Sequence, residues 1–173
     1  LPAQLGQVIY NGRPSEYFTL QHPDTRDRLR QALGIPQDAV VILTAARMDP
    51  VKGYHHQLSA IAQLRHTPVW PKLFFVWAGT GMLEIHLNQN LAAMGVSQQV
   101  KLLGERSDIP ELLEAADIFL LPSHAEGMPL AVMEAMAKGL AVMATAVSGV
   151  PEELGSTGKL LPNPTIDPQA TVR

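Results

Sequence analysis

The chain alternates five short apolar runs with stretches that carry helical signals. The apolar runs cover residues 40–45, 73–78, 100–103, 118–122 and 140–145. Runs this short and this uniformly hydrophobic are typical of strands that are covered on both faces. Helical periodicity or helix end signals mark residues 23–33, 53–66, 81–94, 109–116 and 129–138. This alternation predicts an α/β fold with a parallel sheet and helices on both faces.

Composition and charge exclude several classes of protein. Hydrophobic residues make up 46% of the 173 residues and charged residues 17%, which predicts one globular domain, or two very small ones. The formal net charge of −3 argues against a nucleic-acid partner. The absence of cysteine excludes disulfides and thiolate chemistry, and it fits the cytoplasm. The sequence contains no run of about 18 uncharged apolar residues, so no membrane span is predicted. It also shows no signal peptide pattern.

The loops that follow the strands are where a ligand is expected, because parallel sheets bind ligands beyond the carboxyl ends of their strands. The loop after the first strand carries Arg47 and Lys52 and leads through Gly53 into a helix. Two cations beside a helix N-terminus suit an anionic ligand such as a phosphate. The alternative is a solvated surface loop with two exposed charges.

The stretch after the fourth strand is the most informative part of the sequence. Pro129 is expected at the first helical position, so free backbone N–H groups lie at a helix end that attracts anions. These N–H groups belong to Gly127, Met128, Leu130 and Ala131.

Two carboxylates accompany this helix, Glu126 before it and Glu134 inside it. Eight helical residues would separate them by about 12 Å along the axis, which is too far for the acid pair of a retaining glycosidase. We therefore expect them to hold different parts of one extended ligand. Apolar neighbours suggest that Glu134 has a partner. The alternatives are an exposed helix glutamate for Glu134 and a favourable anion near a helix N-terminus for Glu126.

Two further patterns are weak. Gly79 and Gly81 follow the second strand, and Glu84 stands where a dinucleotide fingerprint has its third glycine, so nicotinamide binding is not expected. Adjacent His55 and His56 are expected to point to different sides of their helix. No metal site is predicted, because five of the six histidines, which are His55, His56, His66, His86 and His124, show no ligand spacing.

Taken together, these motifs resemble the retaining glycosyltransferases of family 4, which have the GT-B fold. Glu126 and Glu134 resemble that family's Glu-x7-Glu motif, and Arg47 with Lys52-Gly53 resembles its Gly-Arg…Lys-Gly loop. Further matches are Asn11-Gly12 with Phe18, Leu121-Pro122-Ser123, Gly149-Val150-Pro151-Glu152 and Gly158-Lys159-Leu160-Leu161-Pro162. The chain departs from the family at Ala46 and Ser148, where glycine is common. The resemblance implies a Rossmann-like domain, the C-terminal, donor-binding half of a GT-B fold.

The resemblance also implies a role for each candidate residue. Arg47 and Lys52 would hold the diphosphate of a nucleotide-sugar. Glu126, with the amides of Gly127 and Met128, would hold the transferred sugar, and Glu134 would bind the ribose. Cations and a helix N-terminus stabilise the charge of a departing diphosphate without a metal, so neither a metal nor a cofactor is expected. The catalytic residues implied are Arg47, Lys52 and Glu126, and the donor-binding residues are Gly127, Met128, Leu130 and Glu134.

The implied organisation is that of a piece of a longer enzyme. Residues 1–20, with a short strand at 8–10, would link an absent N-terminal acceptor domain to a nucleotide-sugar-binding domain at 21–173, which lacks the family's crossover helix. The full enzyme would move a sugar from a UDP-, GDP- or ADP-sugar to a glycan, lipid or small molecule. It would act in the cytoplasm, with the absent domain at the inner face of the membrane, and the isolated piece would be inactive. The alternatives are another GT-B enzyme, such as a sugar-nucleotide epimerase, and a non-catalytic α/β binding module.

Overall fold

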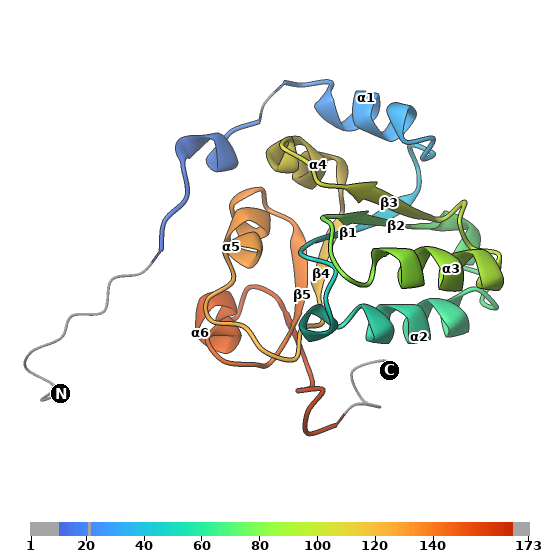
Figure 1. Cartoon of the computed structure of the whole chain (residues 1–173). Coiled ribbons are helices and arrows are strands. Elements are labelled where there is room, and N and C mark those ends of the chain that lie inside the picture. The colour runs from blue at the N-terminus through green and yellow to red at the C-terminus, as the bar shows by residue number, and fades with distance from the viewer. Residues whose placement is uncertain (1–10, 21, 168–173) are drawn as a thin grey trace, which may run out of the picture.

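The structure is a computed structural model that describes residues 11–20 and 22–167, and it contains a six-stranded sheet flanked by helices (Figure 1). The strands are β1 (Val40–Ala45), β2 (Leu73–Ala78), β3 (Val100–Gly104), β4 (Ile118–Leu121), β5 (Ala141–Thr145) and β6 (Lys159–Leu161). The α-helices are α1 (Thr25–Ala32), α2 (Tyr54–Leu64), α3 (Glu84–Met94), α4 (Ile109–Ala115), α5 (Leu130–Ala137) and α6 (Val150–Leu154). Short 3₁₀ turns are η2 (Ser15–Phe18), η3 (Pro50–Lys52) and η4 (Trp70–Lys72). Among the helices of this described part, none has the length and apolar character needed to cross a membrane.

All neighbouring strands of the sheet are parallel, in the order β3-β2-β1-β4-β5-β6. The chain moves outward from β1 through β2 to β3 and then returns to the other side of β1 with β4. The strand order therefore reverses between β1 and β4, and a crevice at the carboxyl ends of these two strands is the expected ligand site. The predicted parallel α/β sheet is confirmed.

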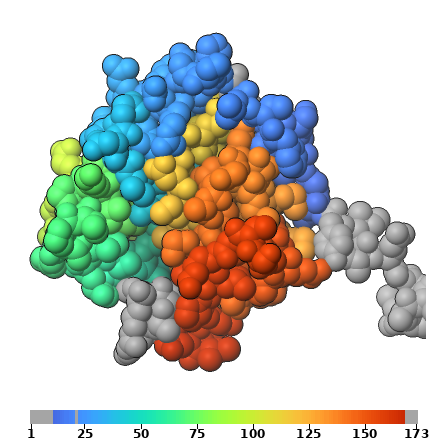
Figure 2. All heavy atoms as spheres, turned by 180° about the vertical axis from the view of Figure 1, so that it is seen from behind, coloured from blue at the N-terminus to red at the C-terminus, as the bar shows by residue number. Residues whose placement is uncertain are grey.

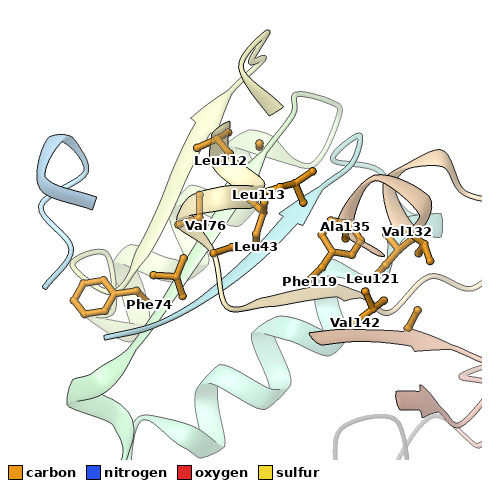
Figure 3. Packing of buried hydrophobic residues seen from close by; sticks show 14 of the residues in the cluster. Leu43, Phe74, Val76, Leu112, Leu113, Phe119, Leu121, Val132, Ala135 and Val142 are labelled. Atoms are coloured by element: carbon orange, nitrogen blue, oxygen red, sulfur yellow. The ribbon is translucent and has the colours of Figure 1, made fainter. Parts of the chain in front are cut away.

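Each face of the sheet has its own hydrophobic core, because successive residues of a strand point to opposite sides. Phe74 and Val76 of β2 belong to a core that includes Leu113 of α4 and Val132 of α5 (Figure 3). The intervening Phe75 and Trp77 belong to the second core, with residues of α2 and α3. Figure 1 shows α2 and α3 side by side on one side of the sheet and α1 and α4 on the other. Helices on both faces are thereby confirmed.

A buried arginine holds the end of the sheet opposite the expected ligand site. Arg30 of α1 is fully buried, and it donates to the Ala115 carbonyl at 2.9 Å and to the Asp117 carboxylate at 2.7 Å. Asp117 also accepts from Arg26 at 2.6 Å and from the backbone N–H of Val41 at 2.7 Å. Burial opposes ionisation of Asp117, but these donors hold the pKa of its carboxyl below the usual value. The network joins α1 to the sheet and is structural.

The structure differs from the predicted elements in three places. The short strand β6 was not predicted, and of the short helix α6 only the start was expected, after a turn at residues 145–152. Pro129 is the residue before α5 rather than its first helical residue, because its ψ of 112° is extended and the helix begins at Leu130. The strand predicted at 8–10 lies outside the described residues.

Candidate functional site

A cavity of about 270 Å³ lies at the carboxyl ends of β1 and β4, where the strand order reverses. Its lining comes from the loop after β1, the loop after β4 and the start of α5. The residues are Ala45, Ala46, Arg47, Lys52, Leu121, Glu126, Pro129, Leu130 and Ala131. Four predicted site residues, Arg47, Lys52, Glu126 and Leu130, are thus brought together at one place. The alternative of a solvated loop with two exposed charges does not hold for Lys52, whose side chain is 18% exposed, whereas Arg47 is 79% exposed.

Lys52 and Glu126 form an ion pair across this cavity. The Lys52 Nζ atom donates to both carboxylate oxygens of Glu126, at 2.8 and 3.0 Å. The Lys52 side chain is 18% exposed and that of Glu126 is 7% exposed, so the pair is largely removed from water. A ligand with both phosphate and hydroxyl groups has an anion for the lysine and donors for the carboxylate, so it can replace both halves of this pair.

Arg47 lines the cavity, but most of its side chain is exposed to solvent. Its side chain is 79% exposed, and its one ion pair in the described structure is with Asp49 at 3.2 Å. The Asp49 side chain is only 17% exposed, so the guanidinium lies in solvent while its carboxylate partner lies largely out of it.

Hydrogen bonds hold the loop after β1 in place. The Met48 N–H donates to the Thr80 carbonyl at 2.8 Å, and the buried Tyr54 hydroxyl donates to the Ala46 carbonyl at 2.9 Å. Gly53 has a φ of +70°, and a Cβ on it would lie 1.8 Å from the carbonyl oxygen of Pro122. Glycine is therefore required here, because it lets the start of α2 touch the end of β4.

A buried polar network fixes the position of α2 on the sheet. The Gln57 side chain donates to Thr44 Oγ1 at 3.0 Å and accepts from the Trp77 indole at 2.8 Å. Thr44 in turn donates to the Leu120 carbonyl of β4 at 2.7 Å. Satisfied buried networks of this kind rigidify a site. The residues that flank the start of α2, Lys52 among them, are thereby positioned against β4.

The N-terminus of α5 faces the cavity through Pro129, Leu130 and Ala131. The loop before it is attached to the loop after β5, since the Gly149 N–H donates to the Gly127 carbonyl at 2.9 Å. The Met128 side chain lines a different cavity, so any contact of Met128 with a ligand here belongs to its backbone. Ser148, where the family resemblance leads one to expect glycine, has a φ of +48°, which is the left-handed conformation that glycine adopts most readily.

Glu134 lies about one turn below the cavity and has a partner that the sequence did not indicate. Its carboxylate forms an ion pair with Arg13, whose guanidinium also lies 4.6 Å from the centre of the Tyr17 ring. Burial raises the pKa of Glu134, and the charge of Arg13 opposes this. The expectation of a partner for Glu134 is confirmed. The segment that carries Arg13 lies against α5, as the blue and orange spheres show (Figure 2).

A second cavity, of about 530 Å³, lies beside α5 and α6 and is lined mainly by apolar side chains, among them Phe18, Met128 and Met133. Glu153 also lines it, and neither of its buried carboxylate oxygens has a hydrogen-bond partner in the described part of the chain. Burial raises the pKa of Glu153 to about 7; the backbone of Met133 opposes this shift, and the nearby charge of Glu126 adds to it. No sequence pattern indicated this group.

One histidine prediction is wrong. The rings of His55 and His56 lie 4.0 Å apart, and both lie 5.0 Å from the ring of His124. The two side chains converge because the loop after β4 brings His124 to the first turn of α2. Sequence spacing gives no sign of this, since 68 residues separate His56 from His124.

The comparisons with known proteins identify similar sequences over nearly the whole chain. The family described as "Glycosyl transferases group 1" matches residues 25–173. An Escherichia coli UDP-Gal:alpha-D-GlcNAc-diphosphoundecaprenol alpha-1,3-galactosyltransferase is 33% identical over 145 residues, which are 82% of this chain and 37% of that protein. A Streptomyces coelicolor D-inositol 3-phosphate glycosyltransferase is 33% identical over 154 residues, covering 82% of this chain and 33% of that protein.

Solved structures agree with the sequence matches. Anabaena Alr3699/HepE, solved with UDP and glucose, has a TM-score of 0.80 and 30% identity, and the match covers 98% of this chain and 50% of that one. The C-terminal domain of a glycosyl transferase group 1 family protein (LpcC) from Francisella tularensis has a TM-score of 0.70 and 26% identity, covering 87% of this chain and 80% of that one. The chain spans about a third of the length of the two curated relatives and half of HepE.

Proposed function

The chain belongs to the glycosyl transferases group 1 family, and on this premise we propose that it is the donor-binding part of a retaining glycosyltransferase. Its ligand would be a nucleoside-diphosphate sugar. The observation that carries this proposal is the convergence of Arg47, Lys52 and the N-terminus of α5 on one cavity at the point where the strand order reverses. Two cations and a positive helix end are what a diphosphate requires.

We propose one role in donor binding for each polar group of the cavity. Lys52 lies within it and would bind the diphosphate first, while the exposed Arg47 would close over the phosphate oxygens. Once Lys52 binds the diphosphate, the Glu126 carboxylate would be free to accept hydrogen bonds from the sugar hydroxyls. The amides of Gly127, Met128 and Leu130 are proposed as further donors to the ligand.

Glu134 would bind the ribose of the nucleotide. Its position about one turn along α5 from Leu130 separates it from the phosphate groups by a distance that a nucleoside spans. Arg13 occupies its carboxylate in the unliganded chain. Binding of the ribose would therefore require Arg13 to share this carboxylate or to leave it.

The reaction proposed for the whole enzyme is sugar transfer with retention of configuration. The bond between the sugar C1 atom and the β-phosphate oxygen breaks, and its electron pair leaves with the nucleoside diphosphate. An acceptor hydroxyl forms the new bond to C1 on the same face, and its proton passes to the departing diphosphate oxygen. The charge that grows on the leaving diphosphate would be stabilised by Arg47, Lys52 and the α5 N-terminus without a metal or cofactor.

UDP is the nucleotide we propose, because HepE was solved with UDP and the Escherichia coli relative carries UDP-Gal in its name. The acceptor would be bound by an N-terminal part of the enzyme, joined through residues 1–20 to the donor domain at 21–173. We place the enzyme in the cytoplasm, at the inner face of the membrane, and expect the donor domain alone to be inactive.

A thermal-shift panel with UDP, GDP and ADP tests the donor assignment. Ligands that bind only the folded chain raise its melting temperature. UDP is expected to raise the melting temperature, and GDP and ADP at the same concentration are expected to raise it less. Equal shifts with all three would remove the assignment of the base, and no shift with any of them would contradict the proposed function.

A further inference from the structure

Three histidine side chains outside the proposed donor cavity converge on one point. His55 and His56 come from the first turn of α2, and His124 comes from the loop after β4. The Nε2 atom of His124 lies 3.1 Å from that of His55 and 3.2 Å from that of His56. One ligand nitrogen from each residue lies within 4.8 Å of the other two.

Hydrogen bonds among the three rings cannot account for this arrangement. The Nε2 atom of a neutral imidazole carries either one hydrogen or one lone pair. His124 Nε2 therefore forms one good N–H···N bond, with His55 or with His56, and its other close contact is left without one. A cation at the centre would accept the lone pairs of all three nitrogens at once.

Two of the three nitrogen separations match the geometry of a bound transition metal. Zn–N bonds of about 2.0–2.1 Å in a tetrahedral site place ligand nitrogens about 3.3–3.4 Å apart. The two measured separations, 3.1 and 3.2 Å, are within a few tenths of an ångström of this value. Three protein nitrogens leave the fourth tetrahedral position for water.

The backbone around the cluster is built to hold these rings together. The His124 N–H donates to the Val51 carbonyl at 2.8 Å, and Gly53 touches the carbonyl of Pro122.

We propose that His55, His56 and His124 bind one divalent transition metal ion, with Zn²⁺ as the natural occupant. Imidazole nitrogens prefer Zn²⁺ and its neighbours in the first transition row over Mg²⁺ or Ca²⁺. The ion would tie the start of α2 to the loop after β4. Those two segments carry Lys52 and Glu126, so the metal would act as a clamp beside the cavity. This proposal does not depend on the donor assignment.

Calorimetric titration of the 173-residue chain with ZnCl₂ tests the proposal. We expect the wild-type chain to bind one ion. In His124→Ala and in His55→Ala the affinity for Zn²⁺ should fall by at least about 10-fold, because loss of a residue that merely supports a ligand already has an effect of this size. His55 is exposed, so its variant is the safeguard if His124→Ala does not fold, which circular dichroism reports. The matched control is the double variant His66→Ala/His86→Ala, which removes two exposed histidines outside the cluster and should bind as the wild type does.

Two results would overturn the proposal. One is the absence of saturable Zn²⁺ binding by the wild-type chain at concentrations up to about 1 mM, which corresponds to a binding free energy of only about −4 kcal/mol. The other is binding that the His55 and His124 variants leave unchanged, or that the control variant abolishes. A second titration with MgCl₂ should give no binding at this cluster, and equal affinity for Mg²⁺ and Zn²⁺ would also contradict a three-imidazole site.

Discussion

Removal of Arg13 should destabilise the folded chain through the buried carboxylate that it leaves behind. The Glu134 side chain is 10% exposed and that of Arg13 is 22% exposed, so their ion pair is mostly out of water. Loss of one partner of a fully buried pair costs about 3–5 kcal/mol. Because Arg13 keeps some contact with solvent and Glu134 can take up a proton, we expect Arg13→Met to cost about 2 kcal/mol at pH 7.5.

The pH dependence of this loss has a definite sign. Burial already raises the pKa of Glu134, and without Arg13 the pKa should rise further. A carboxyl whose pKa is raised on folding stabilises the protein below its unfolded pKa, and this stability is lost as the pH rises through the folded pKa. The deficit of Arg13→Met relative to wild type should therefore be larger at pH 7.5 than at pH 5.

Urea denaturation of a double-mutant cycle measures this effect. The cycle compares wild type, Arg13→Met, Glu134→Gln and the double variant at both pH values, with Arg28→Met on exposed α1 surface as the matched control. Arg13 also contacts Tyr17, and the cycle cancels that loss because both arms share it. We expect a coupling of about 1–2 kcal/mol between Arg13 and Glu134. A coupling near zero, or a deficit independent of pH, would refute the reasoning.

Three further predictions follow from the buried charges and the donor cavity. Glu153→Gln should raise stability relative to wild type at pH 8 but not at pH 4.5. The reason is that folding raises the Glu153 pKa to about 7, so the wild-type chain loses stability as the pH rises through that value. Urea midpoints at the two pH values measure the difference between variant and wild type, and an equal difference at both would contradict the prediction. Arg30→Met should cost about 3–4 kcal/mol because it removes the donor to the buried carbonyls of Ala115 and Ala39 and one of the donors to the Asp117 carboxylate; a thermal midpoint within 2 °C of wild type would rule out this structural role, since about 1 kcal/mol shifts such a chain by 2–4 °C. Glu134→Gln should weaken UDP binding without changing the affinity for inorganic pyrophosphate, because its carboxylate is assigned to the ribose; calorimetry with the two ligands decides, and an equal loss for both would place Glu134 at the phosphates instead.

The main elements of the fold were predictable because each strand is an apolar run and each helix between strands has its own end signals. The strands β1 and β2 match their predicted bounds, since turns and charged residues delimit them on both sides. Lys159–Leu161 escaped prediction because a three-residue strand at the edge of a sheet has too few residues to show a pattern. For α6 only the helix start was predictable, because its single turn, which contains Pro151, is too short to show a periodic pattern.

The candidate cavity was predictable for a topological reason. Parallel strands place their carboxyl ends at one edge, so Arg47, Lys52 and Glu126 were expected to meet there, and the structure brings them together. Contacts that depend on side-chain direction were not predictable. The pairing of Arg13 with Glu134 and the convergence of three histidines arise only after η2 packs on α5 and the start of α2 touches the end of β4.

Calorimetric titration of UDP into wild type and Arg47→Ala is the most direct test of the donor site. Arg47 is 79% exposed but its partner Asp49 is only 17% exposed, so circular dichroism should first show that the variant keeps the wild-type fold. A charged hydrogen bond to the diphosphate is worth about 1.5–3 kcal/mol, so the variant should bind UDP roughly 10- to 100-fold more weakly, whereas Arg28→Ala should bind it as the wild type does. An unchanged affinity for UDP in Arg47→Ala would contradict the assignment of this cavity to a diphosphate.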